Sequence, residues 1–281
     1  MSIVAMTREM GSLGKDVAEG LARDLGLSLY YHEIIDHLAD KTHMAPKVMT
    51  RFLQGKVGMI ESLQVDWDAI SVYTAEEVLD LAAKGNLVIR GWGATSLLRP
   101  VSNVLSVRVC APVVLRARRI MERLGINDSE LALNEIKKSD AAHAALMLRR
   151  FGIHWHDAEH YDLTLNTERL SVQDCIEQIK QVLTHPAFQE SAKSRTELLN
   201  LALSTHIQGA LRNDPETRGV RISIASHANG SVGNVVLQGI VTNDAEKQRV
   251  EAMAFRFPGV LKVDNELRVM TNRKISMTLD G

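Results

Sequence analysis

The sequence predicts an α/β protein in which a parallel sheet is covered by helices, followed by a small α+β domain. Up to about residue 185, short apolar runs alternate with stretches of helical spacing, a pattern typical of parallel sheets with helices on both faces. A change of pattern beyond that point indicates a second domain. A length of 281 residues agrees, because it is large for one hydrophobic core.

The elements of the first domain can be placed along the chain from these patterns. Apolar runs predict strands at 2–7, 27–31, 87–89, 104–109 and 161–166. Helical spacing predicts helices at 15–25, 33–39, 74–84, 113–124, 128–150 and 172–183, with an irregular helical stretch at 42–72. Gly26 and Gly85 each follow a helical stretch, as C-cap glycines do.

A linker is expected at 186–195, because His185-Pro186 ends the last helix and the following residues are polar. This divides the chain into a first domain at 1–185, a second domain at 196–271 and a tail at 272–281. The second domain should contain helices at 198–211 and 245–255 and strands at 220–225, 234–241 and 260–269. Asn229-Gly230 predicts a hairpin between the first two of these strands.

The composition narrows the class of protein. Hydrophobic residues at 45% and charged residues at 24% indicate a globular chain. With 33 basic and 34 acidic residues, no global basic field exists to hold nucleic acid. The two cysteines do not make a disulfide framework, and no apolar run reaches membrane-spanning length. With no signal-peptide pattern at the start, we expect a cytoplasmic protein.

The segment TREMGSLGK at 7–15 lies between the first expected strand and helix and fits a phosphate-binding loop. In such a turn, backbone N–H groups converge on phosphate oxygens and a lysine bridges the terminal phosphates. Gly14 and Lys15 fit that template, whereas Glu9 stands where its first glycine belongs and Asp16 replaces the magnesium-binding hydroxyl. The pattern alone also fits a tight turn, with Asp16 favoured in the first helical turn.

Six stretches together resemble the cytidylate kinase-like family: REMGSLGK (8–15), LGLSLYYHEII (25–35), NLVIRGWGA (86–94), NVLSVRVCAP (103–112), RARR (116–119) and YDLTLNT (161–167). The resemblance covers residues 1–185 in order. It implies a phosphate-loop nucleoside monophosphate kinase fold, with ATP and magnesium (Mg2+) as cofactors and CMP as phosphoryl acceptor.

The resemblance also implies roles for individual residues. The loop residues that would hold ATP are Gly11, Ser12, Leu13, Gly14, Lys15 and Asp16. The catalytic groups would be Lys15, Arg116 and Arg119, since phosphoryl transfer depends on positioning and charge neutralisation. The acceptor would meet Arg8, Tyr31, Arg90, Arg149 and Arg150. The alternative for the helical arginines is a solvated surface.

Four positions depart from the family's pattern. Besides Asp16, Tyr31 stands where an acidic residue is usual, Trp92 replaces the arginine of a Gly-Arg pair, and His143 replaces the arginine that follows Asp140 in the lid. Losing one transition-state arginine can cost on the order of a thousandfold in rate. Two functions therefore stay open: a kinase acting on CMP or a related acceptor, and a catalytically impaired nucleotide-binding regulatory protein.

The second domain resembles the BON domain through NVVLQGIV (234–241), DAEKQRV (244–250) and PGVLKVDNELRV (258–269). This resemblance covers residues 196–271 and implies contact with a lipid, another ligand or a protein partner. A structural role, including assembly into a homo-oligomer, is the alternative.

The densest set of possible metal ligands in the sequence is His154, His156, His160, Asp157 and Glu159. Three histidines can bind zinc when a loop folds around the ion. We interpret these as ordinary loop residues and expect no metal site here. Cys110 and Cys175 lie in apolar surroundings and are expected to act as small buried hydrophobic residues.

Overall fold

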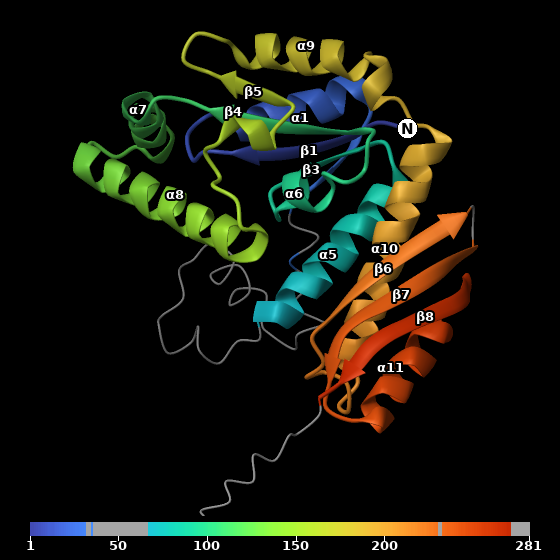
Figure 1. Ribbon diagram of the computed structural model, residues 1–281. Helices are drawn as coiled ribbons and strands as arrows, with labels where there is room; N and C mark the ends of the chain where they lie inside the picture. The colour runs from blue at the N-terminus through green and yellow to red at the C-terminus, as the bar shows by residue number, and fades with distance from the viewer. Residues whose placement is uncertain (32–34, 36–66, 230–231, 271–281) are drawn as a thin grey trace, which may run out of the picture. The chain divides into compact units, whose positions relative to one another are not determined.

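The computed structural model describes residues 1–31, 35, 67–229 and 232–270, and the chain divides into two compact units between Leu198 and Leu199. The first unit contains a five-stranded sheet in the order β2-β3-β1-β4-β5 (Figure 1). Its strands are β1 (Ile3–Arg8), β2 (Ser28–Tyr30), β3 (Leu87–Arg90), β4 (Val104–Cys110) and β5 (Leu163–Asn166). All four neighbouring pairs are parallel, which confirms the predicted fold class.

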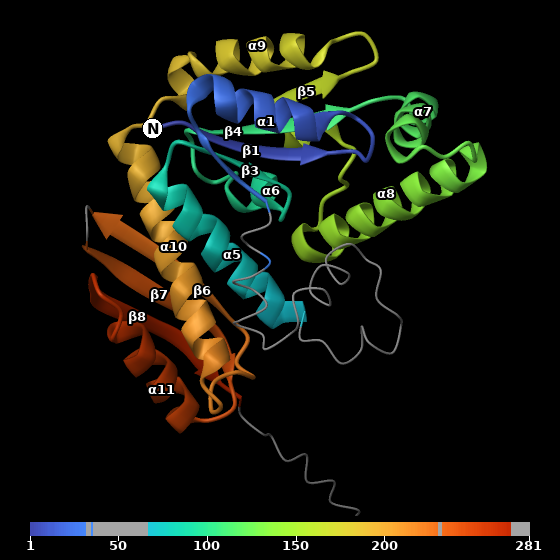
Figure 2. The same ribbon diagram turned by 180° about the vertical axis from the view of Figure 1, so that it is seen from behind.

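Helices cover both faces of this sheet. They are α1 (Gly14–Leu25), α5 (Trp67–Lys84), α6 (Ala94–Leu97), α7 (Val113–Leu124), α8 (Ser129–Phe151) and α9 (Val172–Leu183), with 3-10 turns η1 (Ala158–His160) and η2 (Pro186–Phe188). Figures 1 and 2 show α1 and α9 on one face and α5 and α6 on the other. Val17, Leu21, Ile176 and Ile179 of α1 and α9 are buried against the sheet in one apolar cluster.

The contact between α1 and α9 requires a glycine. Gly20 of α1 packs directly against the Ile176 side chain, so that a Cβ would overlap it. The ends of these helices follow from local chemistry. Gly26 caps α1 in the left-handed conformation, and Ser171 with Asp174 forms a capping box on α9.

The order of the strands identifies the edge of the sheet at which a ligand can bind. β1 lies between β3 and β4, and the chain reaches these two neighbours on opposite sides of β1. Ligands of open α/β sheets bind beyond the carboxyl ends of the strands at such a switch point. The loop from β1 to α1 lies at this edge.

Several boundaries differ from the sequence predictions. β5 begins at Leu163 and not at 161, because the Tyr161 side chain is buried and its hydroxyl donates to the Trp155 carbonyl oxygen (2.8 Å). α5 begins at Trp67, before the expected residue 74. The helix expected at 33–39, and most of the stretch at 42–72, lie outside the described residues.

α10 (Ala192–Asn213) leads into the second unit, which continues with β6 (Ile222–Asn229), β7 (Val232–Val241), α11 (Asp244–Phe255) and β8 (Val260–Val269). β6 pairs antiparallel with β7, and β7 pairs parallel with β8. The predicted β6–β7 hairpin pairing is confirmed, whereas its turn at Gly230 lies outside the described residues. α10 begins inside the segment expected as a linker, so the end of that segment is helical.

The second unit has its own apolar core, which includes Ile207, Val235, Leu237, Val250 and Leu267. Gly239 has φ +146°, and a Cβ there would lie 2.9 Å from Cγ2 of Ile222 on the neighbouring strand. The glycine of the BON-like stretch therefore allows β6 and β7 to approach closely.

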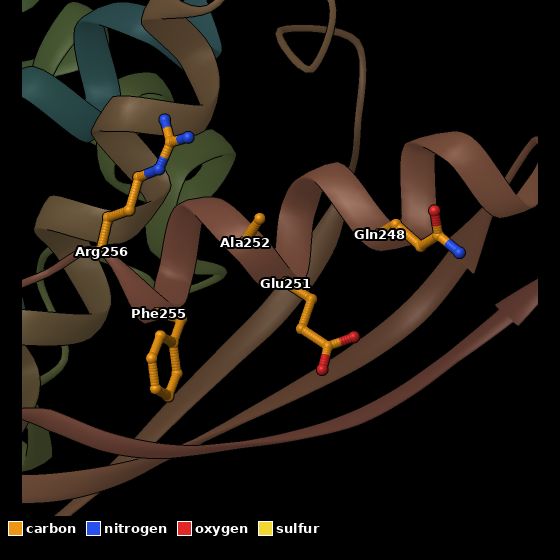
Figure 3. Close-up of a pocket in the computed structure, with 5 residues that line it drawn as sticks. All are labelled: Gln248, Glu251, Ala252, Phe255 and Arg256. Atoms are coloured by element: carbon orange, nitrogen blue, oxygen red, sulfur yellow. The ribbon is translucent and has the colours of Figure 1, made fainter.

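A shallow hollow lies on α11, lined by Gln248, Glu251, Ala252, Phe255 and Arg256 (Figure 3). Phe255 and Arg256 project to opposite sides of the helix, and the Glu251 carboxylate accepts from Nδ2 of Asn265 (2.7 Å). Within the described residues, no helix combines the length and apolar character needed to cross a bilayer.

Candidate functional site

The loop between β1 and α1 is held from outside by side chains of distant segments. Three consecutive carbonyl groups accept hydrogen bonds: that of Met10 from Arg116 (3.3 Å), that of Gly11 from Arg119 (3.4 Å) and that of Ser12 from Thr167 (2.9 Å). The donors come from α7 and from the residue that follows β5. The carbonyl oxygens of the loop are thus directed toward the protein.

The amide groups at the end of the loop are unpartnered. Within the described residues, no acceptor receives the N–H groups of Leu13, Gly14, Lys15 and Asp16. They lie at the N-terminus of α1, where unsatisfied N–H groups and the helix dipole favour an anion. This is the arrangement that binds phosphate in strand-to-helix loops.

Two glycines make the loop compact. Gly11 has φ +81°, and a Cβ there would lie 2.8 Å from the backbone oxygen of Arg116. A Cβ on Gly14 would lie 2.6 Å from Cβ of Arg8. The two glycines of the template are therefore needed because the loop packs closely against α7 and β1.

Glu9 occupies the template's first glycine position and forms a buried ion network. Its Oε1 accepts from Nη2 of Arg108 at 2.6 Å, and its Oε2 lies 3.4 Å from Nε of Arg116. Arg116 also pairs with Asp140 of α8 at 2.8 Å. The Arg116 guanidinium thus links the loop, α7 and α8.

Arg119 is also engaged. Its Nη1 and Nη2 donate to the hydroxyl (2.9 Å) and the carbonyl oxygen (2.7 Å) of Thr167, which in turn bonds the loop. Burial, followed by the nearby charge of Arg118, lowers the pKa of the Arg119 guanidinium. Together, Arg119 and Thr167 fix the loop to the end of β5.

Lys15 lies on the solvent side of α1, with its side chain 56% exposed and Nζ 3.5 Å from Oε1 of Glu19. Such an exposed pair contributes little to stability. The lysine is therefore available to a ligand at the start of the helix.

Arg90 is a buried cation, two of whose guanidinium nitrogens have no hydrogen-bonded partner in the part of the chain that the structure describes. It ends β3 at only 5% exposure, and its Nε and Nη1 have no partner within the described residues. Its guanidinium lies 4.1 Å from the centroid of the Tyr31 ring. Burial first, and then the charge of Arg8, lowers the pKa of Arg90. Arg8, whose side chain lies against Gly14, likewise has no ion pair among the described residues.

These features can be compared with known proteins. Residues 3–169 match the cytidylate kinase-like family, and residues 201–271 match the BON domain. The chain belongs to the cytidylate kinase-like family.

Individual relatives match at low identity but over most of their own length. The chain is 26% identical over 176 residues to a cytidylate kinase of Pyrobaculum aerophilum, covering 63% of this chain and 89% of that protein. A cytidylate kinase of Ignicoccus hospitalis is 27% identical over 187 residues, covering 65% and 99%. An uncharacterized protein from Eubacterium ventriosum has a solved structure that matches with a TM-score of 0.53 at 24% identity. It covers 66% of this chain and 99% of that chain and shares the fold.

His143, at the position where the resemblance to the family implies a lid arginine, is half-buried on α8. His143 of α8 lies with Nε2 3.5 Å from Oγ1 of Thr7, and its ring centroid is 4.5 Å from that of Trp155. Burial, followed by the nearby charge of Arg8, lowers the pKa of His143 to about 4. Nε1 of Trp155 donates to the same Thr7 hydroxyl (3.0 Å). His143 is thus neutral at pH 7 and packed.

Arg149 and Arg150, which the resemblance implies would meet the acceptor, lie in the last turn of α8. Arg150 donates to the carbonyl oxygen of Ser71 on α5 (2.6 Å), and burial lowers its pKa to about 10. Arg149 is exposed on α8. The structure therefore assembles residues 11–16, Arg8 and Arg90 at one edge, while Arg150 is bound to α5.

The histidine-rich loop brings together three potential ligands among the described residues. The ligand atoms of Asp157, Glu159 and His160 lie within 4.8 Å of one another. His156 stacks on Trp155 instead, with ring centroids 4.9 Å apart. Exposed carboxylates commonly group in this way without a metal ion.

Sequence reasoning gave no site role to Glu9, Arg108, Thr167 or Trp155. The sequence carries a signal for two of these residues: Glu9 is a charged residue in a tight turn, and Arg108 is a charged residue inside an apolar strand. Buried charges need partners, so these two residues could have been paired in advance. No local pattern signals Thr167 or Trp155.

Proposed function

We propose that the first unit transfers the γ-phosphoryl group of ATP to a nucleoside monophosphate, with CMP as the first acceptor to test. The observation that supports it most is the row of unpartnered amides at the start of α1, combined with the carbonyls held on the opposite side of the loop. A loop fixed in this way offers donors to phosphate oxygens without having to rearrange. The family membership supplies the reaction class.

In the reaction, an oxygen of the acceptor phosphate forms a bond to the γ-phosphorus of ATP while the bond from that phosphorus to the β–γ bridging oxygen breaks. The loop amides and Lys15 bind the donor phosphates. The guanidinium groups of Arg8 and Arg90 lie at the same edge of the sheet, where their positive charge can neutralise the acceptor phosphate. Their mutual repulsion is relieved when an anion binds between them.

We assign Arg116 and Arg119 to positioning, because their guanidinium groups are bonded to the loop carbonyls and to Asp140 or Thr167. Their effect on the reaction then passes through the shape of the loop.

The oxygen donors at the loop suit magnesium. The hydroxyl of Ser12 is buried with no hydrogen-bond partner, and Asp16 offers a carboxylate in the first turn of α1 with no ion pair among the described residues. Mg2+ prefers oxygen ligands, of which one or two are carboxylates and others are substrate phosphates. Ser12 and Asp16 would hold the ion, which neutralises phosphate charge when bound.

We place this activity in the cytoplasm, where ATP is abundant.

A coupled phosphotransfer assay with ATP, magnesium and a panel of nucleoside monophosphates tests the proposal. The wild type is expected to turn over at least one acceptor, and Lys15→Ala to lose most of that rate. Lys193→Ala is the matched control, since Lys193 also pairs with an i+4 glutamate on an exposed helix surface. Turnover that is equal in wild type and Lys15→Ala contradicts the assigned role of the loop.

A second function is favoured by the neutral, packed His143 at the lid position and by the commitment of Arg150 to α5. In that case the first unit binds ATP without turnover, and the BON domain binds a lipid, another ligand, a protein partner or a second copy of the chain. ATP binding that depends on Lys15, with no transfer to any acceptor, is the result that selects this function.

A further inference from the structure

Trp92 has a backbone conformation that bulky residues rarely adopt. Gly91 (φ +90°), Trp92 (φ +63°) and Gly93 (φ +70°) form a run of left-handed residues after β3. Glycine takes this conformation freely, whereas a residue with a Cβ is strained there. Strained residues of this kind persist where the surroundings hold them, and they cluster at ligand sites.

The surroundings of Trp92 hold it in three ways. Its Nε1 donates to the carbonyl oxygen of Tyr31 at 2.9 Å, which fixes the plane of the indole. The Gly91 amide donates to the Met6 carbonyl oxygen of β1 at 2.8 Å. The ring of Phe151 lies against Gly93, where a Cβ would be 2.6 Å from Cε2. The indole is thus set in place beside Tyr31 before any ligand binds.

Two aromatic rings and one charge form a continuous group here. The ring centroids of Tyr31 and Trp92 are 6.2 Å apart at an interplanar angle of 49°, and both residues are half-buried. The Arg90 guanidinium lies 4.1 Å from the centroid of Tyr31, and its Nε and Nη1 have no hydrogen-bond partner among the residues described. A buried cation that lacks a hydrogen-bonded partner attracts an anion, and the rings beside it offer flat apolar surface.

We infer that Trp92, supported by Tyr31, stacks against the base of the acceptor nucleotide, whose phosphate is bound on the side of Arg90. This inference rests on the proposed function, because it concerns the acceptor end of the same site. A face-to-face contact favours any flat aromatic ring and does not distinguish the hydrogen-bonding edges of different bases. The platform of Trp92 and Tyr31 therefore accepts pyrimidine and purine monophosphates alike and disfavours a phosphate ester that lacks a ring.

The test measures binding by calorimetry, with CMP, AMP, ribose 5-phosphate and ATP as separate ligands. Trp92→Gly removes the ring at a position where the backbone favours glycine, so the fold should be kept, which a thermal midpoint checks. Trp92→Phe keeps a ring but removes the Nε1 donor. Phe255→Ala is the matched control, because it removes a ring of the second unit that is 57% exposed.

Trp92→Gly is expected to weaken CMP and AMP on the order of tenfold each and to leave ribose 5-phosphate and ATP unchanged. Trp92→Phe is expected to retain most of the affinity. Equal affinities in wild type and Trp92→Gly overturn the inference, and so does an equal loss for ribose 5-phosphate. A Trp92→Phe variant as weak as Trp92→Gly also overturns it, because the hydrogen bond would then be the important contact.

The two proposals can fail separately. Monophosphate binding that depends on Trp92, with no phosphotransfer, removes the kinase and keeps the platform. Phosphotransfer with monophosphate binding that is independent of Trp92 removes the platform and keeps the kinase. A wild type that binds no monophosphate contradicts the platform directly.

Discussion

Arg116 bonds both carboxylate oxygens of Asp140, with Nη1 3.2 Å from Oδ1 and Nη2 2.8 Å from Oδ2. The same guanidinium donates through Nε to the carbonyl oxygen of Ala111 (3.0 Å) and through Nη1 to that of Met10. One side chain of α7 therefore joins the phosphate loop, the end of β4 and α8. This geometry supports a positioning role for Arg116.

Asp140→Asn removes the charge of this pair while keeping the shape of the side chain. We expect a loss of about 2 kcal/mol in the free energy of unfolding, because charged hydrogen bonds of this kind are lost. The KM for ATP should rise while kcat changes less, because the loop is loosened. Glu122→Gln, which removes an exposed partner of Arg118 on α7, is the control and should change neither. A collapse of kcat at unchanged stability and KM is incompatible with a positioning role.

Glu9→Gln tests the buried network at the start of the loop. Glu9 lies between Arg108 and Arg116, and all three side chains are at most 8% exposed. Removing the carboxylate leaves two buried guanidinium groups short of a counter-charge, so we expect a loss of about 3 kcal/mol or more. Urea unfolding measures it, with Glu19→Gln as an exposed control. Equal stability of wild type and Glu9→Gln would show that the network is dispensable.

His143 predicts a specific pH dependence of stability. Its folded-state pKa of about 4 lies below the ordinary value of 6.5, with burial and then Arg8 as the leading causes, Asp140 acting in the opposite direction and His156 adding a smaller decrease. Between these two values the unfolded chain binds a proton that the folded chain does not, so stability falls as the pH drops from about 6.5 toward 4.

Urea unfolding of the wild type and of His143→Gln across this range measures the effect. The difference between the two proteins should change with a slope that approaches one proton, and it should become constant above about pH 7.5. A difference that is constant from pH 4 to 7 rules out a neutral, buried His143.

Gly14→Ala tests the close approach of the loop to β1. The new methyl group would lie 2.6 Å from Cβ of Arg8 and 3.1 Å from Cβ of Val109. Overpacking of this kind costs about 1–3 kcal/mol, and the shifted amides should bind ATP less tightly. Gly219→Ala is the control, because a Cβ there meets nothing within 4 Å. An unchanged ATP affinity in Gly14→Ala would show that the loop amides do not approach the phosphates.

The fold could be predicted from sequence because each element carries its own periodic signal. The limits of α7 and α9 agree with the prediction, since clear apolar stripes and end signals such as Gly125 and Ser171 coincide there. The order of the strands could not be derived, because periodicity does not report which strands are neighbours. α10 began earlier than predicted because polar residues on a helix surface resemble a linker.

The sequence predicted the parts of the site that neighbouring residues form. It did not predict the parts that depend on contacts between residues far apart along the chain. The loop at 11–16 was found because Gly11, Gly14 and Lys15 lie close together in one short segment. The partners of Arg116 and Arg119 lie as far as 108 residues away along the chain, so their engagement could not be seen. The same holds for His143, whose neutrality follows from packing against Trp155 and Thr7.

A calorimetric titration of ATP and magnesium into the full chain tests directly whether the loop between β1 and α1 binds nucleotide. We predict binding at one site, weakened at least tenfold in Lys15→Ala and unchanged in Lys193→Ala, because Lys15 stands at the α1 amides that have no partner among the described residues. An absence of ATP binding, or equal affinities in wild type and Lys15→Ala, would contradict it.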